Sequence, residues 1–357
     1  MKLIFILAAV LLFGLLIAVH EFGHFITAKL CGVRVNEFAI GMGPLLWQKE
    51  KGETLYSLRA LPVGGYCAME GEDEDSGDER AFVRQGFFKK LVILAAGSGM
   101  NFIAGVCILL VLYSGAEAFL VDSVTGLAPE FERTGENGLM AGDRFYSVNG
   151  YRTYVAGDAQ LFLSYAGDTA DIVVLRDGEK ITLEDVKKQT YTSMDGSSYT
   201  GFGLYVGKEA VPATVTAKLR FTWYQTLDFV QLVWFSLAQL VTGGAGMEDL
   251  SGPVGIVSTI TQVGEEAQES GGIASALRSV FYFGALLAVN LAVMNLLPIP
   301  ALDGGRIFFL LVDAVALLLF KRTVPERYQA VVNTAGFVVL MGFMLLITFK
   351  DVFQLFR

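Results

Sequence analysis

Two histidines and a glutamate interrupt a stretch that otherwise reads as a membrane-spanning helix. His20, Glu21 and His24 form the pattern His-Glu-x-x-His after an apolar run that begins at Leu3, and the chain has only these 2 histidines. Residues four apart lie on one face of a helix, so both imidazoles can bind the same metal ion. The carboxylate of Glu21 lies one residue round, where it can act as a general base on water. Because ionisable side chains within a span are costly and usually functional, this pattern predicts a zinc hydrolase site.

A third protein ligand for the metal must come from elsewhere in the chain. Catalytic zinc usually takes three protein ligands and a water, so the missing one must be a Cys, Asp or Glu at membrane depth. Asp303 is one candidate, because Pro298 and Pro300 interrupt the apolar run that precedes it. A broken helix at membrane depth is tolerated where it lines a polar cavity. Asp313 and Cys31 are the alternatives.

The composition predicts an integral membrane protein. Of the 357 residues, 53% are hydrophobic, and the mean hydropathy is +0.51. The net charge of −9 and the lack of a basic stripe argue against nucleic acid as a partner, and we expect no nucleotide either. Apolar runs of about 20 residues can cross a bilayer. Such runs predict about four spans, within 1–28, 91–113, 277–320 and 336–350.

Two apolar segments leave alternatives open. Residues 307–320 are short for a span, so they form either a fifth span or a membrane-associated helix, and we prefer the second. Residues 214–244 are long enough, but Lys218, Arg220 and Asp228 are spread along them. We therefore expect an amphipathic helix that lies at the membrane interface there.

Positive charges near the span ends predict the orientation, because cytosolic loops are rich in Lys and Arg. Such residues flank the loop 29–90, whereas none follows the second span before Arg133. The loop is therefore expected in the cytosol, with His20 and His24 near the inner face of the membrane. The polar segment after residue 113 and both termini are then outside.

With these motifs the chain resembles the site-2 protease family, the intramembrane zinc metalloproteases of peptidase family M50. HEFGH at 20–24 is similar to the family's metal-binding span, and NLLPIPALDGGR at 295–306 is similar to its Asn-x-x-Pro…Leu-Asp-Gly element. The stretches EFAIGMGP, LPVGGYCAMEGE and SGPVGI, at 37–44, 61–72 and 251–256, also resemble parts of that family. One position departs from the family pattern Ala-Gly-Pro-x-x-Asn, because Ser98 stands in place of the proline.

The resemblance implies roles for the residues that carry the chemistry. One zinc ion per chain would be held by His20, His24 and Asp303, the last being the family's third ligand. Glu21 would be the general base. The reaction would be hydrolysis of peptide bonds within or near a transmembrane segment.

The resemblance also implies residues that contact the substrate. Asn295 would be catalytic by engaging the developing oxyanion, and Asn290 would bind substrate, although each could instead form a hydrogen bond between helices. An edge strand around 35–43 would open a membrane-associated β-hairpin within 29–90 and pair with an unwound substrate. Its substrate-binding residues would be Phe38, Gly41 and Gly43.

The polar segment resembles a bacterial PDZ domain. NGLMAGDRFYSVNG at 137–150 predicts a strand over 144–148 that ends in an Asn-Gly turn, and 171–186 predicts a hairpin that turns at Asp177 and Gly178. We expect one PDZ-like domain at 118–207. It would either bind the new C-terminus left by an earlier cut or shield the active site from bulky substrates, and we favour shielding.

Together these patterns predict a polytopic α-helical membrane protein with about four transmembrane helices, a membrane-associated β-hairpin and an inserted α+β PDZ-like domain. The resemblance implies a multi-pass protein of the bacterial inner membrane. Its partners would be the lipid bilayer and single-span membrane protein substrates, for example anti-sigma factors or remnant signal peptides. Two other functions stay open on the residues alone: a transporter with a metal or proton site, and a catalytically silent scaffold.

Overall fold

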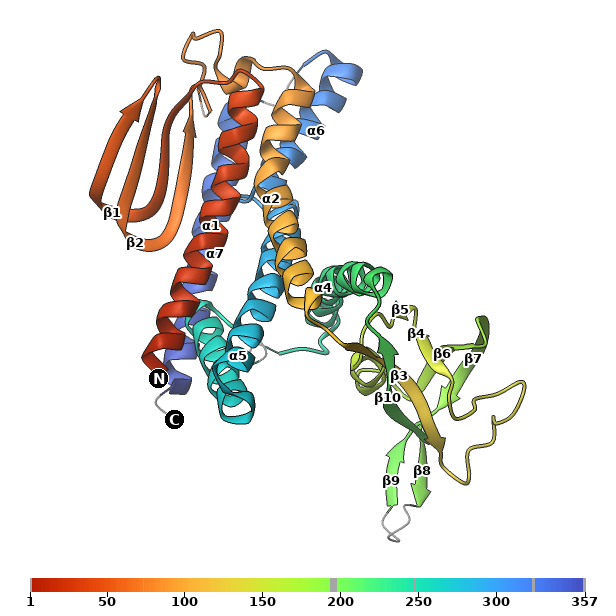
Figure 1. The fold of residues 1–357 in the computed structure, drawn as a ribbon. Helices are drawn as coiled ribbons and strands as arrows, with labels where there is room; N and C mark the ends of the chain where they lie inside the picture. Colours follow the sequence, from red (N-terminus) through yellow and green to blue (C-terminus); the bar gives the residue numbers. More distant parts are fainter. Residues whose placement is uncertain are drawn as a thin grey trace. The chain divides into compact units, whose positions relative to one another are not determined.

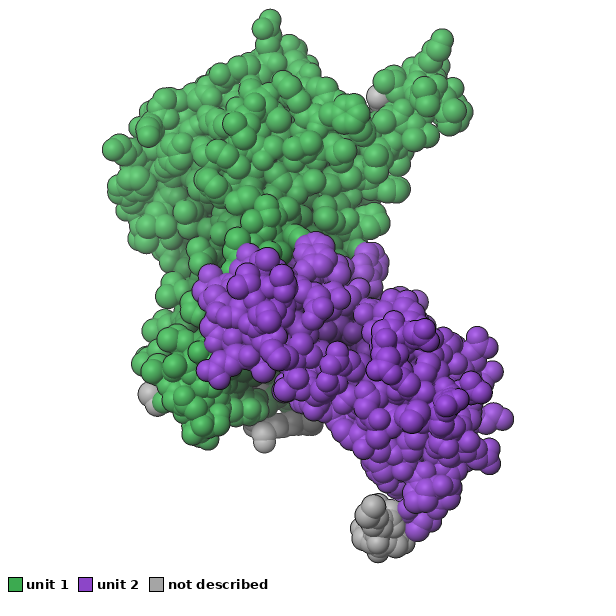
Figure 2. All heavy atoms as spheres, turned by 45° about the vertical axis from the view of Figure 1, so that its right-hand side comes forward, with its two compact units in different colours: residues 1–108, 245–357 green, residues 109–244 purple. Residues whose placement is uncertain are grey.

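The computed structural model describes residues 2–355 except 73, 193–197, 247, 249 and 323–324. The chain forms two compact units, residues 1–108 with 245–357, and residues 109–244, which Figure 2 shows in different colours. The first unit consists of long helices and a β-hairpin, and the second contains the larger sheet (Figure 1).

Within the described residues, four helices are long and apolar enough to cross a membrane, which fits a polytopic membrane protein. They are α1 (Lys2–Leu30), α2 (Phe87–Ser114), α5 (Pro253–Asn295) and α7 (Glu326–Leu355). The two segments with open alternatives form helices outside this set, α6 (Asp303–Phe320) and α4 (Val215–Thr242).

Helix α5 begins 24 residues before the third span expected from residue 277 (277 − 253 = 24). The additional part is not a continuous apolar run, because it contains the polar stretch TQVGEEAQES. Gly272 divides the helix, with φ 73° and ψ −172°, a backbone conformation that favours glycine. The chain therefore forms one helix before this break and the apolar helix after it.

A stripe of apolar side chains fixes the position of α1. Phe5, Ala9, Leu12 and Leu16 are buried and pack against α5, and the next residue on this face is His20. The spacings of three and four residues are those of one helix face. The same periodicity that builds the core thus carries the first histidine into the interior.

Small residues allow the helices of the first unit to approach closely. A Cβ atom at Gly23 would lie 2.4 Å from the carbonyl oxygen of Ala96, where α1 meets α2. At Gly105 a Cβ atom would lie 2.7 Å from Val289, where α2 meets α5. Such contacts between small residues are how helices associate in lipid, where the hydrophobic effect does not drive them together.

The β-hairpin of the first unit is folded back on itself. It consists of β1 (Val35–Lys51) and β2 (Thr54–Met69), which pair antiparallel. Residues 37–40 pair with 65–68 on one side and with 55–58 on the other, while residues 47–51 pair only with 54–58. The expectation of an edge strand around 35–43 is therefore wrong, because the two arms of β2 enclose this segment.

The second unit is built on a five-stranded antiparallel path with the order β10-β3-β4-β6-β7, with β5 paired to β4 and a separate β8–β9 hairpin. The expected turns are present, since Asn149 and Gly150, and also Asp177 and Gly178, have positive φ. A core around Phe162 fills one face. The element bounds are β3 (Ala118–Leu127), β4 (Arg144–Val148), β5 (Tyr151–Arg152), α3 (Asp158–Ser164), β6 (Thr169–Arg176), β7 (Glu179–Lys187), β8 (Gln189–Thr192), β9 (Ser198–Gly201) and β10 (Leu204–Pro212).

The motif SGPVGI forms the start of α5 and is held by the end of α7. The carboxylate of Asp351 is 4% exposed and accepts hydrogen bonds from the backbone N–H groups of Gly252 and Gly255, both at 2.8 Å. A Cβ atom at either glycine would lie within 3.0 Å of this carboxylate. The first N–H groups of a helix have no partner within the helix, so Asp351 satisfies two that would otherwise be unpaired.

We predict that Asp351→Ala lowers the free energy of unfolding of the full-length protein by about 1–3 kcal/mol, because two buried N–H groups lose their acceptor. Thermal unfolding in detergent measures the change. Val352→Ala, at the neighbouring and partly exposed position, is the matched control. Equal melting temperatures for the two variants would show that the carboxylate does not hold α5.

Candidate metal centre

His20 and His24 lie on the buried face of α1, 9% and 7% exposed. Their Nε2 atoms are 3.2 Å apart, and their rings meet at an interplanar angle of 80°. This is the geometry that a spacing of four residues gives on a helix. The prediction that both imidazoles face one point is therefore met by the structure.

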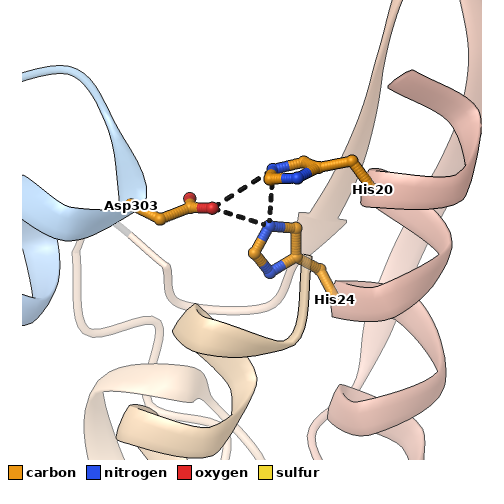
Figure 3. Close-up of side chains that lie close together, drawn as sticks. All are labelled: His20, His24 and Asp303. Carbon is orange, nitrogen blue, oxygen red and sulfur yellow. Dashed lines mark hydrogen bonds and ion pairs between the residues drawn. The ribbon is translucent and has the colours of Figure 1, made fainter. Parts of the chain in front are cut away.

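Asp303 reaches the same point from the other end of the chain. Its Oδ2 atom lies 3.1 Å from Nε2 of His20 and 3.2 Å from Nε2 of His24 (Figure 3). Within the described residues, these three side chains are the one group of His, Cys, Asp and Glu arranged to hold a metal ion. The structure thus brings together the three residues that the sequence proposes as ligands.

The arrangement fits a tetrahedral zinc ion. Ligand atoms about 2.0–2.1 Å from a tetrahedral zinc are separated from one another by about 3.3 Å, close to the separations of 3.1–3.2 Å found here. Among the described residues, the buried Oδ2 atom of Asp303 has the two imidazole Nε2 atoms beside it and no further hydrogen-bond donor. A buried carboxylate oxygen in that state is costly unless a cation compensates it.

The turn between α5 and α6 places Asp303. Helix α5 ends at Asn295, and the chain turns through residues 296–302 before Asp303 begins α6. A Cβ atom at Gly304 would lie 2.1 Å from the carbonyl oxygen of Leu297, and one at Gly305 would lie 2.4 Å from that of Ile299. The two glycines after Asp303 are therefore required by the close approach of the backbone.

Glu21 lies beside the three side chains. It is partly buried and close enough to His20, His24 and Asp303 to interact electrostatically with all of them. A Cβ atom at Gly65 of β2 would lie 3.3 Å from Cγ of Glu21. Glu21 therefore lies near both the candidate ligands and the hairpin.

Helix α2 contributes three features to the centre, and the sequence predicts a role for none of them, although Gly97 and Asn101 belong to the Ala-Gly-Pro-x-x-Asn pattern. A Cβ atom at Gly97 would lie 2.4 Å from Nε2 of His24 and 2.8 Å from Nε2 of His20, so only glycine leaves this space open. The carbonyl oxygen of Ile93 lies 2.8 Å from Nδ1 of His24. Asn101 lies 3.5 Å from Nδ1 of His20 through its side-chain amide and is 1% exposed. The spacing of four residues along AAGSGMN could have indicated this face.

The two predicted asparagines differ in position. Asn295 lies at the site, with its side-chain nitrogen 3.5 Å from Nδ1 of His20. Asn290 is partly buried further up α5, and among the described residues no hydrogen bond joins it to the three candidate ligands. The rival ligands also lie elsewhere, since Asp313 accepts a hydrogen bond from Gln329 and Cys31 packs against the apolar cluster beyond the end of α1.

The hairpin residues that are predicted to bind substrate contribute to the fold of the hairpin itself. Phe38 is 9% exposed and packs against Phe25, with ring centroids 5.0 Å apart. Gly41 and Gly43 have φ of 84° and 81°, which the reversal of the chain within β1 requires. Their role in substrate binding stays a prediction.

Comparison with known proteins places the chain in one family over nearly its whole length. The model of peptidase family M50 matches residues 8–343. A Clostridium perfringens protein named as a zinc metalloprotease is 34% identical over 98% of this chain and 98% of its own length.

Two further bacterial relatives carry more specific names. The zinc metalloprotease RasP of Shouchella clausii is 29% identical over 98% of this chain and 99% of its own length. The regulator of sigma-W protease RasP of Bacillus subtilis is 26% identical over the same shares. These matches agree with the geometry of the centre: the chain belongs to peptidase family M50 and is a zinc metalloendopeptidase of the site-2 protease type.

Proposed function

We propose that this chain hydrolyses peptide bonds within or near the transmembrane segment of single-span membrane proteins, with one zinc ion per chain held by His20, His24 and Asp303. The observation that carries the proposal is the triangle of two imidazole nitrogens and one carboxylate oxygen, with sides of 3.1, 3.2 and 3.2 Å. Three protein ligands leave one tetrahedral position open, which is the arrangement of catalytic rather than structural zinc sites.

The chemistry divides between the metal and the side chains around it. A zinc ion held by His20, His24 and Asp303 would supply Lewis acidity and would lower the pKa of the attacking water to about 7. Glu21 accepts a proton as the water oxygen attacks the scissile carbonyl carbon, and donates it to the amine nitrogen as the C–N bond breaks. Asn295 donates a hydrogen bond to the carbonyl oxygen as negative charge develops there. The position of Glu21 beside all three ligands supports its role.

A substrate helix must unwind before its carbonyl groups can react, and its backbone then needs new hydrogen-bond partners. We assign this function to residues 65–69 of β2, which pair with β1 on one side only among the described residues. A Cβ atom at Gly65 in this segment would lie 3.3 Å from Cγ of Glu21, so a strand added to the free edge would run beside the proposed general base. This assignment replaces the enclosed segment around 35–43.

The surroundings of the site suggest where the protein works. Leu45, Leu46 and Trp47 of the hairpin are 45%, 64% and 53% exposed, which supports contact of the hairpin with lipid. We place loop 29–90 on the cytosolic side of the bacterial inner membrane, as its positive charges indicate. The name of the Bacillus subtilis relative connects that protein with sigma-W. We therefore expect anti-sigma factors among the substrates, with remnant signal peptides as the other class.

For residues 118–207 we propose a PDZ-like domain on the opposite side of the membrane. The order of its antiparallel strands and the short helix α3 support this domain type. We favour a role in excluding substrates with bulky outer domains. Capture of a newly cut C-terminus is the alternative.

The roles of the ligands and of the base can be separated by substitution. We predict that Glu21→Gln retains the zinc content of wild type but lowers cleavage of a model single-span substrate at least 100-fold, because the proton acceptor is lost. His24→Ala should lose both the metal and activity. Metal analysis and gel-based cleavage in reconstituted membranes measure these outcomes. Substantial cleavage by Glu21→Gln would contradict the assignment of the base.

Gly97 provides a test that leaves every ligand in place. We predict that Gly97→Ala lowers the bound zinc at least tenfold, because the new methyl group would occupy space against Nε2 of both histidines. Gly99→Ala is the matched control, since a Cβ atom there meets nothing within 4 Å. The same zinc content in both variants would mean that α2 does not border the metal position.

The substrate edge can be located by disulfide cross-linking. In a variant that lacks the native cysteines and carries Glu21→Gln, we predict that Ala68→Cys forms a cross-link with a cysteine placed near the scissile bond of the substrate. Gln48→Cys, on the other outer segment of the hairpin, should remain at background. A stronger cross-link at position 48 would move the substrate to that edge and contradict the assignment.

A further inference from the structure

His20 and His24 each have a second ring nitrogen, Nδ1, that faces away from the proposed metal. A neutral histidine that binds metal through Nε2 carries its hydrogen on Nδ1, and an acceptor for this hydrogen fixes the tautomer and the orientation of the ring. For His24 the acceptor is the carbonyl oxygen of Ile93, 2.8 Å away. His20 needs a corresponding acceptor.

Two side-chain amides lie next to Nδ1 of His20. The amide groups of Asn101 and Asn295 each have their nitrogen 3.5 Å from this atom. An amide nitrogen cannot accept the hydrogen of Nδ1, but a half-turn of the amide group exchanges its nitrogen and oxygen at nearly the same positions. Either asparagine can present its oxygen to His20 in this way.

Burial and partners favour Asn101 for this role. Asn101 is 1% exposed, and its buried Oδ1 atom has no donor among the described residues, whereas Asn295 is partly exposed at the last residue of α5. Turning the Asn101 amide gives its oxygen a donor and gives His20 an acceptor. Asn101 also stands four residues after Gly97, on the face of α2 that touches both rings.

We propose that Asn101 is a positioning residue: its side-chain carbonyl accepts a hydrogen bond from Nδ1 of His20 and directs Nε2 toward the metal. The backbone of α2 serves His24 in the same way through Ile93. Asn295 is then free to donate to the substrate. This inference rests on the proposed zinc site, and it adds that α2, which supplies no ligand, sets the orientation of both imidazoles.

The test measures zinc affinity of the full-length protein in detergent, by competition with a chromophoric chelator. We expect Asn101→Ala and the nearly isosteric Asn101→Leu to weaken zinc binding by about 10–100-fold, as loss of such a partner typically does. Asn101→Asp keeps an acceptor oxygen and should stay within about threefold of wild type. Cobalt(II) in place of zinc should show altered visible absorption bands in the Ala and Leu variants alone.

Two controls separate this role from packing and from the proposed function. Ser98→Ala, at an equally buried position of α2 whose Oγ atom has no hydrogen-bond partner, should bind zinc as wild type does. Asn295→Ala should keep its zinc affinity but lower kcat. Wild-type affinity in Asn101→Leu, or a loss in Asn295→Ala instead, would overturn the inference while leaving the zinc site standing. A wild-type protein without zinc affinity would overturn both.

Discussion

The structure depends on the convergence of two imidazoles and one carboxylate among apolar helices. Ionisable groups at membrane depth are stable only if they meet one another, a cation or water. Here His20, His24 and Asp303 bring their ligand atoms within 3.2 Å of one another. The buried stripe of α1, the glycine contacts of α2 and the turn before α6 all serve this one meeting point. The stripe of α1 provides apolar packing, whereas the glycines of α2 and those after the turn allow the backbones to approach closely.

The need to pair polar groups in lipid applies to the backbone of the substrate as well, and it bears on the proposed role of the hairpin. An unwound helix segment cannot leave its backbone groups unpaired in lipid. Among the described residues, the folded-back pairing of β1 and β2 leaves residues 65–69 unpaired on one side, beside Glu21, the proposed general base, while residues 37–40 are paired on both sides. Residues 65–69, which lie beside Glu21, are therefore a better candidate for pairing with the substrate than the segment of β1 that contains Gly41 and Gly43.

Much of the site could be predicted from the sequence, because it depends on the spacing of residues that are close together in the chain. A spacing of four residues fixes the relation of His20 and His24 on any helix, and apolar runs reveal most of the spans. The sequence alone left Asp303, Asp313 and Cys31 as rival ligands, because choosing among them requires knowing which distant segments meet. Gly97 and Asn101 belong to a family pattern, but for the same reason the sequence did not predict their contacts with the histidines of α1. The order in which the segments of the hairpin pair could not be predicted from the alternation of apolar and polar residues. The register also depends on the turns and on β-bulges, which shift it.

The most direct test of the central claim is X-ray absorption at the zinc edge on the metal-loaded, full-length protein. The account predicts a first shell of nitrogen and oxygen only, at about 2.0–2.1 Å, with multiple scattering from two imidazole rings. Asp303→Ala should lose one light-atom ligand while both imidazole signals remain. A sulfur shell at about 2.3 Å, which would bring Cys31 into the site, or a spectrum unchanged by Asp303→Ala, would contradict it.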